Sequence, residues 1–278
     1  MTKLKALIIF LIITGAGVFF IFGQNIMQKI ESRMTETSLF FIETGIEEMK
    51  KEISLPPPLK AQIEAINSFL TQQGTVYWTN AQRREHGLPA LQENAKLNAS
   101  ARAKLNDMLE NQYFDHVSPS GVEMKNLVAD SGYEFINIGE NLALGNFKDD
   151  QLLVQSWMDS PGHRANILDI RYQEIGVAVG KGTFEGKTTW MAVQHFGLPL
   201  SACPQPDEII KDKIDEKEAQ ANEILMILEE MKSPVYGQTT KEYNQLVIQY
   251  NSIIEQTRIL INQYNNQVEL FNKCLSEI

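Results

Sequence analysis

Two of the four histidines in the chain lie beside loops rich in Ser, Pro and Gly. His116 precedes such a loop in the string FDHVSPSG, and His163 follows Ser160, Pro161 and Gly162 in SPGHRANIL. Loops on a rigid scaffold carry binding and catalytic residues more often than element interiors do. An imidazole can move a proton near neutral pH, ligate a metal ion or bond a polar ligand. The pair is the first candidate for chemistry, although each histidine could equally cap its own loop.

The segment from about residue 75 to 200 has the pattern of a compact α/β domain. Helical spacing predicts helices at 76–87, 94–111, 122–131 and 149–158. Two β-rich runs predict strands at 174–180 and 188–197, joined by a turn at 181–187. Helices followed by an antiparallel hairpin predict helices on both faces of a small sheet. Because Pro161 ends one helix and Gly162 permits a tight turn, we expect His163 at a turn rather than inside a helix.

The first 25 residues predict a membrane segment. Lys3 and Lys5 precede an uncharged run, residues 6–23, that is just long enough to span a bilayer. A cleaved signal peptide is the competing interpretation, since small residues at 14–17 permit cleavage. Both interpretations place the rest of the chain outside the cytoplasm. It would be membrane-anchored in the first case and secreted in the second.

Residues 26–70 predict a helical stalk with a break at Pro56, Pro57 and Pro58, because proline lacks the N–H that a helix needs. We expect a further helix at 59–70, ended by Gly74. The predicted organisation is a signal anchor at 1–25, a stalk at 26–70, an α/β domain at 71–202 and a helical tail at 203–278.

The tail predicts two helices joined by the turn-forming string SPVYGQTT. From Tyr243 the apolar positions alternate by three and four, which is typical of a coiled-coil seam. Two such helices most often form an antiparallel hairpin, although the seam could instead pair with a second copy or a partner. In a hairpin the two cysteines, Cys203 and Cys274, return close together, so we predict a disulfide between them.

The charge of the chain limits its partners. A formal net charge of −10 argues against a nucleic-acid partner, which would need a basic face. No CxxC motif or Cys/His cluster of zinc-finger type occurs in the sequence.

Five strings occur in a fixed order: TNAQRREHGLPAL, LNASARAKLNDMLENQYFDHVSPSG, GENL, WMDSPGHRANIL and WMAVQHFG. Together they resemble the bacterial branch of the CAP superfamily, also called SCP-like proteins, over about residues 75–200. The resemblance implies an α/β/α sandwich with a shallow cleft that gathers two histidines and two acidic residues. His116, Glu140 of GENL and His163 match three of these positions. At the fourth, where eukaryotic members of the family typically carry Glu three residues after a Trp, this chain has Ser160 after Trp157, with Asp159 beside it.

Such a cleft permits two kinds of function. His116, His163 and Glu140 could hold a divalent ion such as zinc and act as a metal-assisted hydrolase of peptide or cell-wall bonds. The departure at the fourth position and the lack of an evident nucleophile favour a binding module instead. The sequence therefore predicts an extracytoplasmic, membrane-tethered CAP-domain protein that binds a lipid, envelope or protein ligand, with metal-assisted hydrolysis as the alternative.

Overall fold

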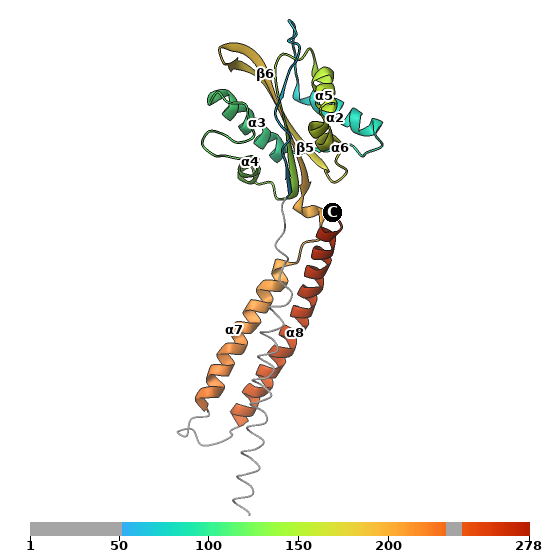
Figure 1. Cartoon of the computed structure of the whole chain (residues 1–278). Helices are drawn as coiled ribbons and strands as arrows, with labels where there is room; N and C mark the ends of the chain where they lie inside the picture. Colours follow the sequence, from blue (N-terminus) through green and yellow to red (C-terminus); the bar gives the residue numbers. More distant parts are fainter. Residues whose placement is uncertain (1–51, 232–240) are drawn as a thin grey trace, which may run out of the picture. The chain divides into compact units, whose positions relative to one another are not determined.

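The structure is a computed structural model that describes residues 52–231 and 241–278 (Figure 1). The described residues divide into two units, one formed by residues 52–204 together with 274–278, the other containing residues 205–273. The predicted membrane segment at 6–23 and the first part of the stalk lie outside the described residues. Among the helices that are described, none is long and apolar enough to cross a membrane.

The first unit is built on a mixed sheet. Within the described residues its strands are β1 (Glu52–Ser54), β2 (Leu59–Lys60), β3 (Gln92–Glu93), β4 (Phe135–Leu144), β5 (Glu174–Phe184) and β6 (Lys187–Pro199). The order is β1-β4-β6-β5-β3, and β2 also pairs with β4. The predicted hairpin is confirmed as β5 and β6, but its turn is tighter than expected. Only Glu185 and Gly186, both with positive φ, separate the two strands.

Helices cover both faces of the sheet (Figure 1). On one face lie α2 (Gln72–Glu85), α5 (Asp150–Asp159) and α6 (Pro161–Leu168); on the other lie α3 (Ala95–Glu110) and α4 (Met124–Asp130). Trp157 and Ile167 belong to the apolar core of the first face, and Leu105 and Met108 to that of the second. The predicted α/β/α sandwich is confirmed.

The position of α3 is determined by its N-cap residue and by a glycine in the sheet against which it packs. Its N-cap is Asn94, whose side-chain oxygen accepts from the backbone N–H of Lys96 at 2.9 Å. Gly176 of β5 lets the helix backbone approach the sheet, because a Cβ there would lie 2.1 Å from the carbonyl carbon of Leu97. The helix predicted at 94–111 therefore forms, packed close against the sheet.

Residues 52–70 differ from the prediction. The expected stalk helix is wrong for these residues, since β1 and β2 pair with β4 and no helix forms between residues 52 and 71. Backbone N–H groups of Ala61 and Ala65 donate to the carbonyls of Leu144 and Asn146, each at 2.8 Å. These long-range bonds replace the helical ones. Gly74 does not end a helix either, because α2 starts at Gln72 and runs through it, capped by Thr71.

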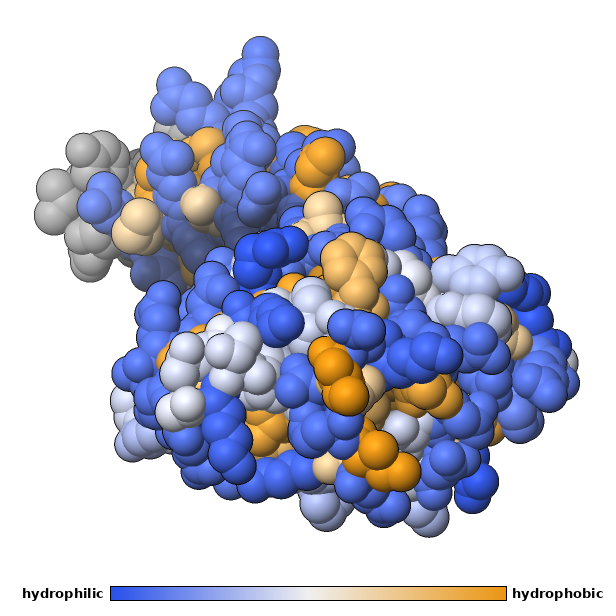
Figure 2. Space-filling view, turned by 90° about the horizontal axis from the view of Figure 1, so that it is seen from above, coloured by the Kyte–Doolittle hydropathy of each residue, from blue (hydrophilic) through white to orange (hydrophobic). Residues whose placement is uncertain are grey.

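This segment leaves some apolar side chains in solvent. Ile66 is fully exposed, and Ile63 and Phe69 are largely so. On the face seen in Figure 2, hydrophobic residues form small groups that hydrophilic residues separate. Exposed apolar residues in small groups are ordinary on soluble surfaces and require no partner.

The structure also contains a strand that the sequence did not predict. β4 runs from Phe135 to Leu144, contains the GENL string, and is buried at every position. Its polar residues Asn137, Glu140 and Asn141 interrupt the apolar pattern by which a buried strand is recognised. Glu140 of the GENL string therefore lies within a strand.

The second unit contains α7 (Glu208–Met231) and the greater part of α8 (Lys241–Ser276). The two helices pack antiparallel: Ile214 near the start of α7 shares an apolar cluster with Ile261, and Leu228 near its end shares another with Tyr250. The predicted hairpin is confirmed. The buried residues of α8 are Tyr250, Ile253, Thr257, Ile261, Val268 and Phe271. Self-association through these helices stays a prediction.

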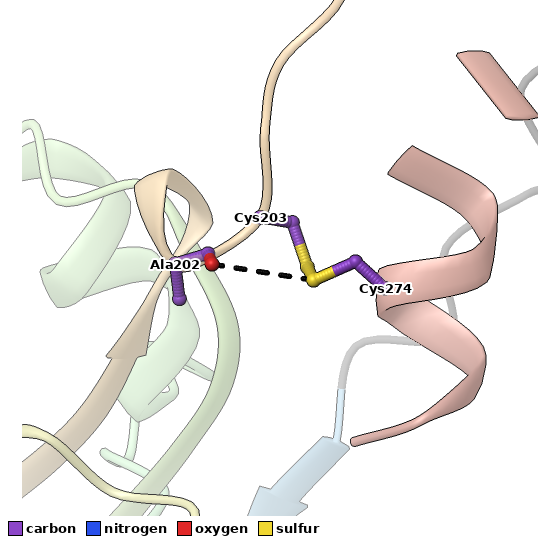
Figure 3. The surroundings of a disulfide bond; sticks show 3 residues. All are labelled: Ala202, Cys203 and Cys274. Atoms are coloured by element: carbon purple, nitrogen blue, oxygen red, sulfur yellow. Dashed lines mark hydrogen bonds between the residues drawn. A yellow bond between two sulfur atoms is a disulfide. The ribbon is translucent and has the colours of Figure 1, made fainter. Parts of the chain in front are cut away.

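The predicted disulfide is present. The Sγ atoms of Cys203 and Cys274 are bonded at 2.05 Å, and the Cα atoms lie 5.8 Å apart (Figure 3). Cys203 follows a short 3₁₀ turn, η1 (Leu200–Ala202), and Cys274 lies in the last turn of α8. The Cys274 sulfur also contacts the carbonyl oxygen of Ala202 at 4.0 Å. The bond closes a loop that contains the whole of the hairpin.

Candidate functional site

The centre of the site is the carboxylate of Glu140, which is fully buried in β4. One oxygen lies 2.6 Å from Nδ1 of His116 and the other 2.8 Å from Nε2 of His195. His195 stands opposite Glu140 in the β4–β6 ladder, and its Nδ1 lies 2.8 Å from the hydroxyl of Ser100 in α3. A loop, two strands and a helix thus meet in one hydrogen-bonded network.

Electrostatics make this network an ion pair. Burial alone would raise the pKa of Glu140, but hydrogen bonds from His116 and His195 and the nearby positive charges hold it well below its usual range. Burial alone would lower the pKa of His116, but its hydrogen bond with Glu140 and the charge of that carboxylate raise it above the ordinary value. Glu140 is therefore a carboxylate and His116 is favoured as the imidazolium.

A buried lysine positions the His116 loop. Nζ of Lys104, in α3, donates to the backbone carbonyl of His116 at 2.7 Å and lies 4.9 Å from the centre of the Tyr113 ring. Burial lowers the pKa of Lys104, and the negative charge of Glu140 partly offsets that effect. Ser118 closes the loop, since its hydroxyl accepts from the N–H of Val122 at 2.9 Å. The Ser-Pro-Ser-Gly string therefore serves to hold His116 in place.

The second ring nitrogen of His116 has a partner from outside the α/β domain that the sequence predicted. Nε2 donates to the backbone carbonyl of Pro56 at 2.6 Å, and Pro56 is buried. Both nitrogens of His116 are thus used, one by Glu140 and one by the segment between β1 and β2.

His163 lies in the first turn of α6 and is buried, so the expectation of a turn outside any helix is wrong. Pro161 does not keep the chain out of a helix, because proline fits the first helical position, where its missing N–H needs no partner. Nδ1 of His163 lies 2.8 Å from the Ser160 hydroxyl, while Nε2 has no hydrogen-bond partner among the described residues. Burial and the positive charge of His116 lower the pKa of His163 to about 4. This histidine is therefore neutral at pH 7.

Ser160 and Asp159, which stand at the fourth position of the family pattern, lie in different surroundings. Ser160 reaches the site, through its bond to His163. Asp159 is exposed at the end of α5, where it accepts from the side chain of Gln155 at 2.9 Å. The structure thus brings His116 and Glu140 into direct contact. His163 lies in α6, which is tied to β4 by the Asn166 amide donating to the Glu140 carbonyl at 3.3 Å, and Asp159 is not brought to them.

The predicted metal set is not supported by this geometry. Across residues 52–231 and 241–278, no group of three or more His, Cys, Asp or Glu side chains could hold a metal ion. The reason lies in the donor atoms, since both nitrogens of His116 and both oxygens of Glu140 are engaged in hydrogen bonds. A zinc ligand must present a free lone pair, and among the ring nitrogens of His116 and His163 only Nε2 of His163 has no hydrogen-bond partner within the described residues.

Sequence reasoning missed several members of the network: His195, Ser100, Lys104 and Pro56. His195 alternates with the buried Val193 in a strand, so its own pattern left its direction open. Recognition of GENL as a strand that pairs with WMAVQHFG would have placed Glu140 opposite His195.

Comparison with known proteins agrees with this architecture. The model of the cysteine-rich secretory protein family, CAP, matches residues 76–196. The uncharacterized protein YkwD of Bacillus subtilis is 39% identical over 119 residues, which are 43% of this chain and 44% of that protein. The uncharacterized membrane protein YlbC of the same organism is 29% identical over 164 residues, which are 57% of this chain and 47% of that protein. The chain thus matches less than half the length of these relatives.

Among solved structures, an extracellular protein containing an SCP domain from Bacillus anthracis is 28% identical, with a TM-score of 0.39. The match covers 45% of this chain and 39% of that one. The family match spans α3, the His116 loop, β4, α6 and the β5–β6 hairpin, which are the elements that build the Glu140 network. Residues 76–196 of the chain therefore form a CAP domain, a member of the cysteine-rich secretory protein family.

Proposed function

We propose that the chain is an extracytoplasmic, membrane-tethered CAP-domain protein that binds a lipid, envelope or protein ligand through the region of His116, Glu140 and His163. One observation carries the proposal: the buried polar atoms of Glu140, His116 and His195 are all engaged in hydrogen bonds. Such a network rigidifies a site and orients its donors, which suits recognition.

Three observations support the location. The Cys203–Cys274 disulfide is of the kind that persists in oxidising compartments. The uncharged run at 6–23 follows two lysines, as in a signal anchor. One relative is named as a membrane protein. Each fits a domain held at the outer side of a membrane.

The alternative, hydrolysis, has less support from the charges of the site. A general base works best with a pKa near the working pH. The pKa of Glu140 is held far below this range, and that of His163 lies at about 4. His116 is held as a cation between two acceptors. None of the three is set up to take a proton from water at neutral pH.

The test compares binding with turnover in the full-length chain. We would incubate it with cell-wall sacculi and, separately, with phosphatidylglycerol vesicles, and measure co-sedimentation together with the release of soluble muropeptides. His163→Ala removes the buried ring with the unpartnered nitrogen, and the exposed His86→Ala is the matched control.

We expect His163→Ala, but not His86→Ala, to lose at least tenfold in retention on one of these probes, with no soluble product from either protein. Release of muropeptides that disappears in His163→Ala would overturn the binding proposal in favour of hydrolysis. If a probe retains the unmodified chain, and retains both variants equally well, the site takes no part in binding that probe.

A further inference from the structure

The segment EISLPPPLK, residues 52–60, lies along the edge of β4 that faces away from β6. It runs parallel to β4, with Ser54 opposite Gly139 and Leu59 opposite Ala143. Between these two pairs the segment advances by five residues, whereas β4 advances by four. The pairing is interrupted between these points, where the three prolines have no N–H to donate to a ladder.

At the interruption the CAP domain holds the segment through other contacts. The carbonyl of Pro56 accepts from Nε2 of His116 at 2.6 Å, and the carbonyl of Ser54 accepts weakly from the Asn166 amide at 3.4 Å. The Pro56 ring lies against Gly162, where a Cβ would be only 2.7 Å from the Cβ of Pro56. One polar anchor and one close-fitting ring therefore hold the middle of the segment.

Burial along the segment is uneven. Residues 52–55 are exposed, Pro56 is buried, and Pro57 is exposed again. A strand that belongs to a core buries a whole face, whereas a peptide added to a sheet edge is held by its main chain and by one or two pocketed side chains. The segment has the second pattern. Its first residue adds a surface ion pair, Glu52 with Arg171 at 2.5 Å.

The residues that hold the segment lie inside the region that matches the CAP family, and the segment itself lies outside it. His116 and Asn166 also have partners inside the domain: Lys104 donates to the carbonyl of His116, and the Asn166 amide donates to the Asn141 side chain. Gly162 lies in the first turn of α6. His163, next to Gly162, also keeps a buried Nε2 without a partner among the described residues. The edge of β4 and the residues beside it thus belong to the domain, and the segment occupies that edge.

From these contacts we infer that the edge of β4 between His116 and Gly162 is a binding site for an extended, proline-containing peptide strand of a partner protein, and that residues 52–60 are a resident peptide that such a strand displaces. The inference rests on the proposed binding function and names the ligand class for the same site. The favoured peptide runs parallel to β4, buries one proline against Gly162, presents that proline's carbonyl to His116, and carries an acidic residue four positions earlier for Arg171.

A free peptide must displace residues 52–60, and this competition determines the affinity that we expect for it. A tethered segment competes at an effective concentration that is in the millimolar range for short linkers. A free peptide therefore binds weakly while the segment is in place, and more tightly when the segment is weakened, because apparent affinity scales with the fraction of open sites.

The probe is a fluorescein-labelled synthetic peptide, EISLPPPLK, added to the full-length chain and followed by fluorescence anisotropy. A segment variant, Pro56→Gly/Pro57→Gly/Pro58→Gly, weakens the resident strand. We expect the probe to bind this variant at least tenfold more tightly than the unmodified chain. An unlabelled EISLPPPLK peptide should compete for the site, whereas EISLGGGLK should not.

Gly162→Ala in the segment variant is the decisive substitution. The added methyl group fills the space of the Pro56 ring and lies on an exposed helical residue, so the fold should be kept or slightly stabilised. We expect at least a tenfold loss of probe affinity with no fall in the thermal unfolding midpoint. If the probe binds the segment variant equally well with and without this methyl group, the inference is overturned. It is also overturned if the segment variant does not bind the probe, or binds it no more tightly than the unmodified chain does.

The two proposals fail separately. If the peptide test fails while sacculi or vesicles are retained through His163, the peptide inference is wrong and the binding function stands. If the peptide binds as described and neither other probe is retained, the ligand is a protein and both proposals stand. Failure of all three probes overturns both.

Discussion

Glu140 and His195 stand directly opposite each other in the β4–β6 ladder, and their side chains are joined by a 2.8 Å hydrogen bond in a fully buried environment. With His116 on its other oxygen, Glu140 links the central strands to the loop after α3. A buried carboxylate is tolerated only when it is paired in this way, so the network couples the site to the stability of the domain.

Replacing Glu140 with Gln should destabilise the domain strongly. The amide has nearly the same shape but removes the charge that His116 and Lys104 require, so we expect a loss of about 3 kcal/mol in the free energy of unfolding. Urea denaturation followed by circular dichroism measures it. Glu134→Gln, at an exposed residue just before the same strand, is the control and should change the value by less than about 0.5 kcal/mol. Similar effects for both variants would contradict the paired-carboxylate description.

The two site histidines should give stability opposite dependences on pH. The folded pKa of His116 lies above its ordinary 6.5, so its contribution is complete below 6.5 and is lost as pH rises through the folded value. The folded pKa of His163 is about 4, so the unfolded chain gains a proton between 6.5 and 4 that the folded chain resists. Stability should therefore fall on both sides of about pH 6.5.

The fall in stability above about pH 6.5 is the alkaline arm of the curve, and the fall below it is the acid arm. Two variants separate these arms when unfolding midpoints are measured from pH 4.5 to 8.5. His116→Asn should flatten the alkaline arm, and His163→Asn should flatten the acid arm. The charges that act on His116 are those of Glu140 and Lys104, and Glu140 adds its own loss of stability only below its ordinary pKa of 4.5. An alkaline arm that persists in His116→Asn would assign it to another group.

Removing the disulfide should destabilise the chain. Cys203 and Cys274 are 71 residues apart, and closing a loop of that length is worth about 4 kcal/mol on the loop-entropy account. We expect Cys274→Ser and the double variant Cys203→Ser/Cys274→Ser to lose similar amounts in chemical denaturation. A reducing agent should lower the stability of the unmodified chain only. An unmodified chain that is insensitive to reduction would contradict the prediction.

The hairpin core should respond to a single cavity. Leu228 is fully buried between α7 and α8, so Leu228→Ala should cost about 2–5 kcal/mol in unfolding of the hairpin. Met226→Ala, two residues earlier and 61% exposed, should have little effect. The helical signal at 222 nm as a function of urea gives both values. If the two variants unfold alike, the buried face of α7 has been assigned incorrectly.

Elements with strong local signals could be predicted from the sequence. α3 has a capping Asn94 and a regular apolar stripe, and the β5–β6 hairpin has alternation and a turn glycine. The disulfide followed from two cysteines at similar distances from the turn between the tail helices. The helix and the hairpin are specified by residues close together in the sequence, and the disulfide follows from the positions of the cysteines relative to one turn.

What the sequence could not show depends on contacts between distant residues. β4 was missed because its Asn141 and Glu140 side chains are buried against distant partners, which are the carbonyl of His163, the Gln194 side chain and the His195 ring. The segment 52–60 was assigned to a stalk because nothing within it indicates pairing with residues 137–144. The roles of His195 and Pro56 in the site follow from these two elements, so they were missed with them.

The cross-link between Cys203 and Cys274 also determines the path of mechanical tension. If the chain is pulled between a point in the CAP domain and its C-terminal residue Ile278, the covalent route runs through the sulfur–sulfur bond and leaves out residues 204–273. The helical hairpin would then carry none of the force and could remain folded while the domain is stretched. Only after reduction of the bond would the same pull extend the hairpin, adding seventy residues of slack to the chain.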